Sequence, residues 1–357
     1  MRPEAKRVVP RIAGIGAYVP SRVATNDEVL GYLRDQSAPY LSPEDCEALV
    51  NTARRKLLNS GCRERHWSAP DEWCTDLARM AAARALEDAA IHPDELDLII
   101  FAGMAKAFVE PATAHVLRHE LAATNASLFD LGDACTGIMK GLEVAGALIS
   151  TGKYRTILVT AGERIFEWAD YRCKSLDELT WKFGSLTIGD AGGALIVQAT
   201  DAPDFVDDPR HWQFFYSFVD DSYSTCNMGL SHRVGEHYRL YSHSTRLFRQ
   251  GRAAGEALCA RLFADPTWRE HQYENIFLHE VGNVVCNTAF AILRRIGAHI
   301  PLDTYRSVWP EHGNVATASL PLGMWYAKQE GRLRRGNRVA FYCPAAGVQA
   351  GIMFFRY

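Results

Sequence analysis

The chain has 357 residues, of which 48% are hydrophobic and 23% are charged, and its formal net charge at pH 7 is -3. This composition is typical of a globular protein with one large or two smaller hydrophobic cores, and it excludes fibrous and disordered proteins. Proteins that bind nucleic acids or anionic membrane surfaces carry an excess of basic residues, so neither is expected as a partner. We expect small molecules or proteins instead.

The nine cysteines are scattered and include no Cys-x-x-Cys pair. This pattern favours reduced thiols over a disulfide framework or a zinc site. No segment approaches the roughly 18 apolar residues that a membrane span requires, and the basic residues 1–10 lack the apolar core of a signal peptide. We therefore expect a cytoplasmic protein with no metal and no membrane span.

The first 200 residues predict alternating strands and helices, the pattern of a parallel sheet. The predicted strands lie at residues 11–19, 96–103, 127–131, 156–161 and 189–197. The first predicted helix starts at residue 25, where Thr-Asn-Asp-Glu resembles a capped helix start. Further helices are predicted at residues 42–58, 75–90, 111–121 and about 138–149.

The remaining residues predict a second half on the same plan. Residues 201–252 are rich in aromatic residues, Asp and His, have weaker periodicity, and are expected to shape a substrate site. Helices are then predicted at 253–263, 283–296 and 315–330, strands at 275–279 and 305–308, and a closing hairpin at 337–356. We expect two halves, residues 1–200 and 201–357, although no residue-level repeat proves a duplication.

Cys135 lies at a small-residue turn where a buried strand gives way to a helix. Unpaired N–H groups and the positive end of the dipole at a helix N-terminus favour an anion, so this position is expected to favour the nucleophilic thiolate. The alternative is a small buried cysteine that packs the helix against the sheet.

Three further candidates lie at the ends of predicted elements in the second half. His279 ends an apolar strand, where open α/β sheets place their sites, and it is either a proton shuttle or a hydrogen-bonded core residue. Asn314 precedes a helix and is either only an N-cap or an amide donor to a developing oxyanion. The small-residue loop 344–351 either brings a backbone N–H close to a ligand or is merely a tight turn.

Residues 62–67, Cys-Arg-Glu-Arg-His-Trp, form a basic and aromatic stretch. The simplest interpretation is a solvated surface loop with a salt bridge, because exposed charges usually contribute little.

These separate signals together resemble the β-ketoacyl synthase III branch of the thiolase-like condensing enzymes, over nearly the whole chain. The order and spacing of the motifs carry the resemblance. The motifs are residues 14–20 with 25–26, 60–66, Asp-Ala-Cys-Thr-Gly at 133–137, 189–194, His279, His-Gly-Asn at 312–314 with 318–321, and 346–347.

The resemblance implies an α/β thiolase fold, a five-layered α-β-α-β-α sandwich, in a homodimeric ketosynthase without a bound cofactor. Cys135 would take an acyl group from a CoA or acyl-carrier-protein thioester. His279 and Asn314 would then stabilise the enolate of a second thioester in a Claisen-type condensation. The N–H groups of Cys135 and Gly347 would form the oxyanion hole.

Several departures from the family pattern point to a specialised-metabolite or unusual lipid enzyme. Residues 54–59 lack the tryptophan that stacks on CoA in housekeeping members, although Arg55 could still contact phosphate, and Arg63 and Arg65 are further candidates for thioester or pantetheine binding. After His279 the chain has Glu-Val-Gly-Asn in place of the usual Gln-Ala-Asn. Residues 164–186 are longer and more charged than a minimal member needs.

Glu110 lies where housekeeping members place an apolar residue that reaches into the partner's acyl tunnel. An acid here resembles the subgroup that condenses two long or preformed acyl chains, such as olefin-pathway and pyrone-forming synthases, in which the carboxylate is thought to act as a base in the other subunit's site. The alternative is a helix-start glutamate beside Pro111, favoured by the helix dipole.

Two other functions remain open: acyl transfer to an oxygen or nitrogen nucleophile, and a non-catalytic partner subunit. The presence of Asn314 argues against the first, and the intact set of Cys135, His279 and Asn314 argues against the second. The sequence does not determine the acyl chain length, the second substrate, the choice between CoA and carrier protein, or the pathway.

Overall fold

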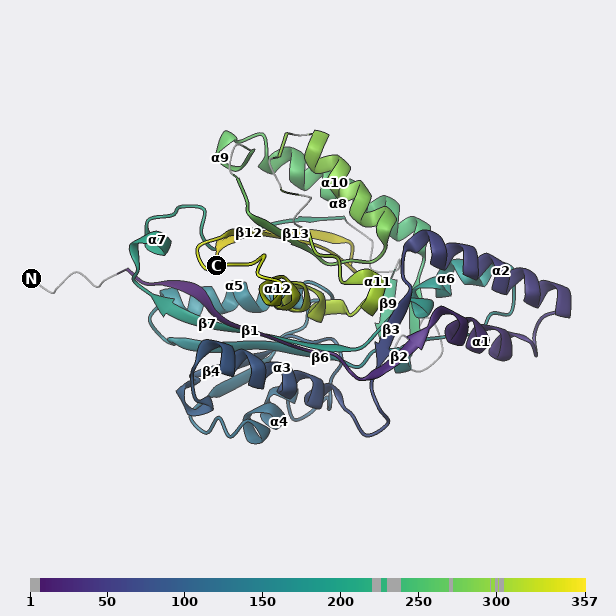
Figure 1. Ribbon diagram of the computed structural model, residues 1–357, viewed down its shortest axis with the longest axis horizontal. Helices are drawn as coiled ribbons and strands as arrows, with labels where there is room; N and C mark the ends of the chain where they lie inside the picture. Colours follow the sequence, from purple (N-terminus) through teal and green to yellow (C-terminus); the bar gives the residue numbers. More distant parts are fainter. Residues whose placement is uncertain are drawn as a thin grey trace, which may run out of the picture.

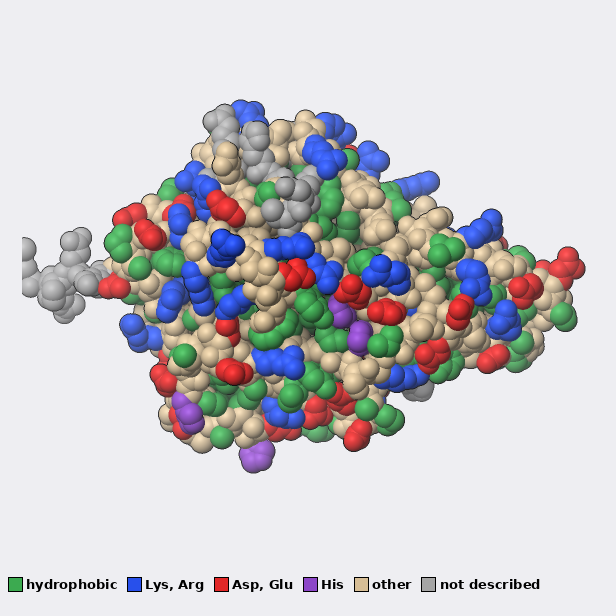
Figure 2. Space-filling view, in the orientation of Figure 1, with side chains coloured by type: hydrophobic (Ala, Val, Ile, Leu, Met, Phe, Trp, Pro, Cys, Tyr) green, Lys and Arg blue, Asp and Glu red, His purple; other side chains and the backbone are tan. Residues whose placement is uncertain are grey.

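Two β-sheets lie face to face, with one helical layer between them and one on each outer side (Figure 1). This computed structural model describes residues 7–219, 226–229, 239–269, 272–295, 297–298, 301 and 305–357. The arrangement confirms the expected five-layered α-β-α-β-α sandwich. Figure 2 shows acidic and basic side chains interspersed over the same face, consistent with the small net charge.

The first sheet has the strand order β1-β7-β6-β4-β5 and draws every strand from residues 9–200. Its strands are β1 (Val9–Tyr18), β4 (Leu98–Phe101), β5 (Ser127–Asp130), β6 (Thr156–Glu163) and β7 (Ala191–Thr200). β4 runs parallel to β5 and β6, while β7 is antiparallel to β1 and β6. Every residue of β4 is buried, as its continuous apolar run predicts.

The second sheet has the order β11-β12-β13-β8 and draws its strands from residues 213–356. Its strands are β8 (Gln213–Phe218), β11 (Asn275–Leu278), β12 (Arg338–Ala345) and β13 (Gln349–Arg356). β12 and β13 form the predicted closing hairpin. The division of the chain into two halves at residue 200 remains a prediction.

Helices α5 (Gly137–Ser150) and α12 (Ser319–Gln329) fill the space between the sheets and bury the central core. α3 (Cys74–Ala89) and α4 (Thr113–Glu120) cover the outer face of the first sheet, and α8 (Ser244–Leu262) and α10 (Asn283–Arg295) cover that of the second (Figure 1). Each outer layer has its own apolar cluster against the sheet that it covers.

An arm made of α1 (Asn26–Ser37) and α2 (Pro43–Ser60) projects from one end of the sandwich (Figure 1). Thr25 caps α1 as predicted, because its side chain accepts a hydrogen bond from the Glu28 N–H. The charged segment 164–186 packs against the arm, where the Ser37 hydroxyl donates to the carbonyl of Tyr171 and accepts from the Cys173 N–H.

The short elements complete the chain. They are β2 (Arg22–Thr25), β3 (Glu64–Trp67), α6 (Leu179–Lys182), α7 (Pro203–Val206), β9 (Cys226–Gly229), β10 (Arg239–Ser242), α9 (Pro266–Arg269), α11 (Trp309–His312), and the 3-10 turns Pro93–Glu95, Phe166–Trp168, Leu176–Glu178, Phe183–Leu186 and Ala316–Ala318. Among the described residues, no helix has the length and apolar content that crossing a bilayer would require.

The predicted strand at residues 305–308 is wrong. The N–H groups of Val308 and Trp309 donate to the buried carboxylate of Glu280, at 2.6 and 2.9 Å, so they are satisfied without a neighbouring strand. The helix predicted from residue 315 begins at Ser319, after a 3-10 turn, and the one predicted from 253 already begins at Ser244. Residues 220–225 and 230–238 of the expected substrate-shaping region lie outside the described residues.

Candidate active site

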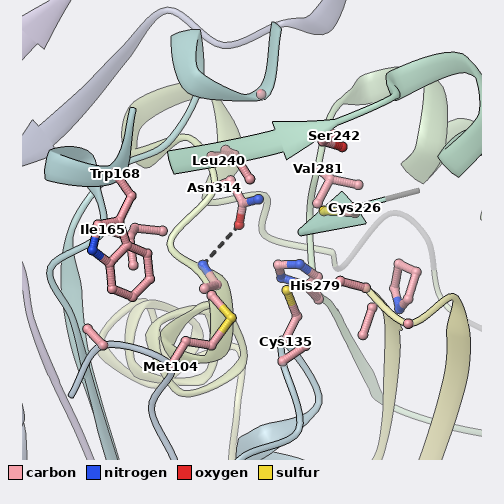
Figure 3. A pocket seen from close by; sticks show the side chains of 18 of the residues that line it. Met104, Cys135, Ile165, Trp168, Cys226, Leu240, Ser242, His279, Val281 and Asn314 are labelled. Atoms are coloured by element: carbon pink, nitrogen blue, oxygen red, sulfur yellow. Dashed lines mark hydrogen bonds between the residues drawn. The ribbon is translucent and has the colours of Figure 1, made fainter. Parts of the chain in front are cut away.

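One cavity of about 1540 Å³ is lined by Cys135, His279, Asn314, Gly347 and Glu110 together. Cys135 follows β5, and His279 follows β11, so both lie just beyond the carboxyl ends of strands, as expected for an open α/β sheet. Figure 3 shows the side chains of Cys135, His279 and Asn314 at this cavity. The structure therefore brings together residues that lie far apart in the sequence.

Cys135 lies in a tight turn that leads into α5. Ala134, the preceding residue, has a φ of 43°, a left-handed conformation that alanine rarely adopts. The turn is closed by hydrogen bonds from the Thr136 N–H to the Asp133 carbonyl and from the Gly137 N–H to the Ala134 carbonyl. Gly137 is required because a Cβ there would lie 2.2 Å from the carbonyl oxygen of Ala102, so the turn is seated directly against the end of β4.

Burial raises the pKa of the Cys135 thiol well above its ordinary value, although a hydrogen bond from the Ala346 N–H opposes the shift. This direction runs against the expectation that the position favours the thiolate. α5 begins only at Gly137, two residues beyond the cysteine, so Cys135 lies outside the first turn of the helix. A neighbouring base must accept the thiol proton when the sulfur attacks.

His279 has the properties of that base. Burial lowers its pKa to about 4, so the imidazole is neutral at pH 7. Its Nδ1 lies 2.9 Å from the Ser319 hydroxyl, which is also 2.8 Å from the Ala316 carbonyl, while Nε2 has no partner among the described residues. When the hydroxyl donates to Ala316, Nδ1 carries the proton and Nε2 can accept one; when it donates to Nδ1, Nε2–H becomes a donor.

Asn314 makes side-chain and backbone hydrogen bonds that fix its place at the cavity. Its Oδ1 accepts a hydrogen bond of 2.9 Å from the Ala316 N–H, drawn as a dashed line in Figure 3, so the residue caps the turn that leads into α12. Its backbone is held on both sides, because its N–H donates to Thr187 and its carbonyl accepts from Gly189. The Nδ2 group makes no hydrogen bond with the described residues and is available to a ligand in the cavity.

The loop between β12 and β13 lines the same cavity. Gly347 has a φ of 76° and lines the cavity beside Ala346, whose N–H donates to the Cys135 sulfur. The thiol of Cys343, in β12, lies 3.3 Å from the Cys135 carbonyl oxygen. This loop therefore approaches the nucleophile closely and is more than a tight turn.

Glu110 lines the cavity from an exposed loop. Its neighbours Phe108 and Val109 have exposed fractions of 53% and 97%. α4 begins at Thr113, and its first N–H groups donate to the carboxylate of Asp130 at 2.9 Å. Glu110 is therefore not needed as the helix-start carboxylate.

The three arginines proposed for thioester binding lie away from the cavity. Arg65 is fully buried and donates to the carbonyls of Ala24 and Leu186 and to the Asn26 side chain, so it has no surface on which a thioester could bind. Arg63 is exposed and forms an ion pair with Glu311 at 3.5 Å.

Arg55 is also exposed. The stretch containing the other two arginines is not a solvated loop, because residues 64–67 form β3, in which Arg65 and Trp67 are buried.

Sequence reasoning missed Glu163, a fully buried carboxylate at the end of β6. It accepts hydrogen bonds from the N–H groups of Met104 and Ala105, at 3.0 and 3.1 Å, and from the hydroxyl of Thr317. It thereby fastens the loop carrying Met104, which lines the cavity, to the segment that follows Asn314. A carboxylate at the end of an apolar strand is the sequence feature that could have identified this residue.

Comparison with known proteins supports this description. Residues 129–208, which include the nucleophile turn, match the family model of 3-oxoacyl-[acyl-carrier-protein] synthase III.

Among solved structures, the synthase III FabH of Pseudomonas aeruginosa PAO1 is 24% identical over 98% of both chains, with a TM-score of 0.78. Cerulenin-bound OleA of Xanthomonas campestris is 19% identical over the whole of both chains, also with a TM-score of 0.78. The priming β-ketosynthase of the R1128 polyketide pathway is 23% identical over 98% of this chain and 97% of that one, with a TM-score of 0.75. The thiolase fold and the resemblance to synthase III condensing enzymes are thus confirmed.

Proposed function

We propose that this chain, which has the fold and the nucleophile segment of the synthase III condensing enzymes, is a ketosynthase that joins two acyl thioesters by a Claisen-type carbon–carbon bond. The observation that carries the proposal is the meeting of Cys135, His279 and the Asn314 amide in one cavity. A thiol beside a neutral imidazole and an amide donor supplies both a nucleophile and a site for developing negative charge.

In the first half-reaction, the thiol proton of Cys135 passes to Nε2 of His279 as the sulfur attacks the carbonyl carbon of the first thioester. The N–H groups of Cys135 and Gly347 donate to the oxyanion that forms. The tetrahedral intermediate collapses, its carbon–sulfur bond to CoA or the carrier breaks, and the departing thiolate takes the proton from His279. The product is an acyl thioester on Cys135.

In the second half-reaction, the carbonyl oxygen of another thioester accepts hydrogen bonds from Nε2–H of His279 and Nδ2–H of Asn314. These donors stabilise the enolate, whose α-carbon attacks the acyl group on Cys135. The carbon–sulfur bond to the enzyme then breaks, and the Cys135 thiolate takes up a proton: the α-proton that the base removed to form the enolate or, after loss of CO₂, a proton from solvent. The product is a β-ketoacyl thioester.

The enolate arises either by loss of CO₂ from a malonyl-type thioester or by removal of an α-proton. For the second route we propose Glu110 of a partner subunit as the base, in a homodimer. The exposure of its apolar neighbours Phe108 and Val109, which leaves the loop open to contact with another subunit, supports this, as does the capping of α4 by Asp130 in its place.

The size of the cavity supports a long-chain substrate. Its volume of about 1540 Å³ exceeds the roughly 300–1,000 Å³ of ordinary small-molecule pockets. A short acetyl primer would leave most of it unfilled. We therefore propose long or preformed acyl groups, carried on CoA or on an acyl carrier protein, within lipid or specialised-metabolite biosynthesis.

Intact-protein mass spectrometry after incubation with a panel of acyl-CoA and acyl-carrier thioesters tests the proposal. The protein should gain the mass of one acyl group at Cys135 and release a β-keto product when a second thioester is added. Acylation followed by transfer only to alcohols or amines, with no carbon–carbon product, would favour an acyltransferase instead.

A further inference from the structure

The side-chain amide of Gln349, the first residue of β13, binds the turn that carries the nucleophile. Its Nε2 donates to Oδ1 of Asp133 at 2.9 Å and to the hydroxyl of Thr136 at 3.1 Å. These two residues flank Ala134 and Cys135. The two amide hydrogens therefore hold both ends of the turn.

The contacts close into a ring. The Thr136 hydroxyl donates toward Asp133, with the carbonyl oxygen at 2.6 Å and Oδ2 at 2.7 Å. Gln349 thus donates to Asp133 and to Thr136, and Thr136 donates to Asp133. Because the turn includes the left-handed Ala134, a conformation that is costly for alanine, this ring restrains a backbone that would otherwise relax.

Stability alone does not explain a glutamine at this position. The side chain is buried, with an exposed fraction of 4%, and its Oε1 has no hydrogen-bond partner among the described residues. An orphaned buried acceptor is destabilising, whereas an apolar side chain of similar shape avoids this cost. The opposite orientation of the amide would place Oε1 against Oδ1 of Asp133, a carboxylate oxygen that has no proton to donate.

Gln349 also lies two residues after Gly347 and three after Ala346, whose N–H contacts the Cys135 sulfur. A single buried side chain therefore links the nucleophile turn to the loop that supplies the second oxyanion donor. The separation between the N–H groups of Cys135 and Gly347 depends on this link.

We infer that Gln349 is a positioning residue that, through Asp133 and Thr136, holds the two oxyanion N–H groups at the spacing that thioester attack requires. The inference rests on the proposed function and adds a residue to its machinery. Displacement of catalytic groups by about 1 Å can cost on the order of 100-fold in rate, so the link is expected to affect catalysis more than binding.

The test compares two reactions of the same sulfur. Acylation of Cys135 by decanoyl-CoA passes through an oxyanion, whereas alkylation by iodoacetamide does not. In Gln349→Met, which keeps the length of the side chain and removes its donors, kcat for acylation should fall roughly 10- to 100-fold, by displacement of the oxyanion donors. KM and the alkylation rate, measured by peptide mass spectrometry at Cys135, should stay within about twofold of wild type, since neither depends on the oxyanion.

Two further variants complete the design. Thr136→Val opens the ring from its other side and should give the same selective loss, which keeps the test decisive if Gln349→Met does not fold. Gln198→Met is the matched control, because the Gln198 side chain bonds only Arg11, at 3.1 Å, within the described part of the chain. It lies away from the turn, so this variant should acylate like wild type.

Equal losses of acylation and alkylation, or no loss in either ring variant, would overturn the inference while wild-type acylation still supports the proposed function. A wild-type protein that no thioester in the panel acylates would overturn both.

Discussion

Acidification should destabilise the protein through His312, and replacing this residue should remove part of the effect. The ring stacks on Tyr326 with centroids 5.5 Å apart, and the His66 ring lies 5.1 Å away. Both ring nitrogens are buried without a hydrogen-bond partner among the described residues. Burial, together with the His66 ring and Arg306, lowers the pKa of His312 to about 4, and Glu311 opposes this shift.

The direction and size of this pH effect on stability follow from the linkage between proton binding and folding. The folded pKa lies about 2.5 units below the ordinary 6.5, so between pH 6.5 and pH 4 the unfolded chain binds more protons than the folded one. The contribution of His312 to the free energy of unfolding is therefore fully present above pH 6.5 and decreases as the pH falls toward 4. Between pH 7 and pH 5 the loss from His312 is about 2 kcal/mol. His279, whose pKa is also lowered to about 4, adds a loss of about 2 kcal/mol, whereas burial of Asp190 raises its pKa to about 6 and offsets about 1 kcal/mol.

Urea unfolding at pH 7 and pH 5, followed by circular dichroism, measures the effect. His312→Phe keeps a ring against Tyr326 but cannot be protonated, so it should lose about 2 kcal/mol less than wild type between these pH values. Comparing the two proteins cancels the contribution of Asp190. An equal loss in wild type and variant would refute the assignment of this histidine as a buried neutral base.

The remaining predictions concern the reaction itself. Cys135→Ala should abolish acylation in the mass assay, and acyl mass gained at the wild-type rate would show that the nucleophile lies elsewhere. Asn314→Ala should leave acylation intact and slow condensation roughly 10²–10³-fold, the typical effect of losing one oxyanion donor. Because the buried thiol needs a base, His279→Ala should slow acylation as well, and normal acylation in this variant would exclude the proton transfer. Glu110→Gln should spare acylation but abolish condensation of two non-malonyl chains, and a mixed dimer of Glu110→Gln with Cys135→Ala subunits should keep one working site. Normal condensation by Glu110→Gln would favour a malonyl-type donor, and an inactive mixed dimer would show that Glu110 does not act in the partner's site.

Much of the fold was predictable because its strands are apolar runs that are buried on both faces. β4, β6 and β11 illustrate this, and each lies within about two residues of its predicted bounds. The placement of candidates at strand ends followed from the same logic, since parallel strands gather their carboxyl ends at one edge. His279 was singled out in this way, and Cys135 from the small-residue turn between its strand and helix.

The predictions from sequence failed where tertiary contacts determine the burial or the hydrogen-bond partners of a residue. Arg65 appeared to be a surface cation, but its guanidinium is buried among backbone carbonyls that no local pattern reveals. The pKa of Cys135 is set by burial in a cavity that forms only when both sheets are in place. The bond between Gln349 and Asp133 joins residues 216 positions apart, a pairing that one sequence does not encode visibly.

Glu163 has a consequence for the thermodynamics of substrate binding. By holding the N–H groups of Met104 and Ala105, it orders a cavity wall before any thioester arrives. The conformational entropy of that wall, about 1–2 kcal/mol for each residue fixed, is therefore lost during folding and not during binding. More of the free energy of contact with the acyl chain remains available for affinity, which is the thermodynamic advantage of a preorganised site.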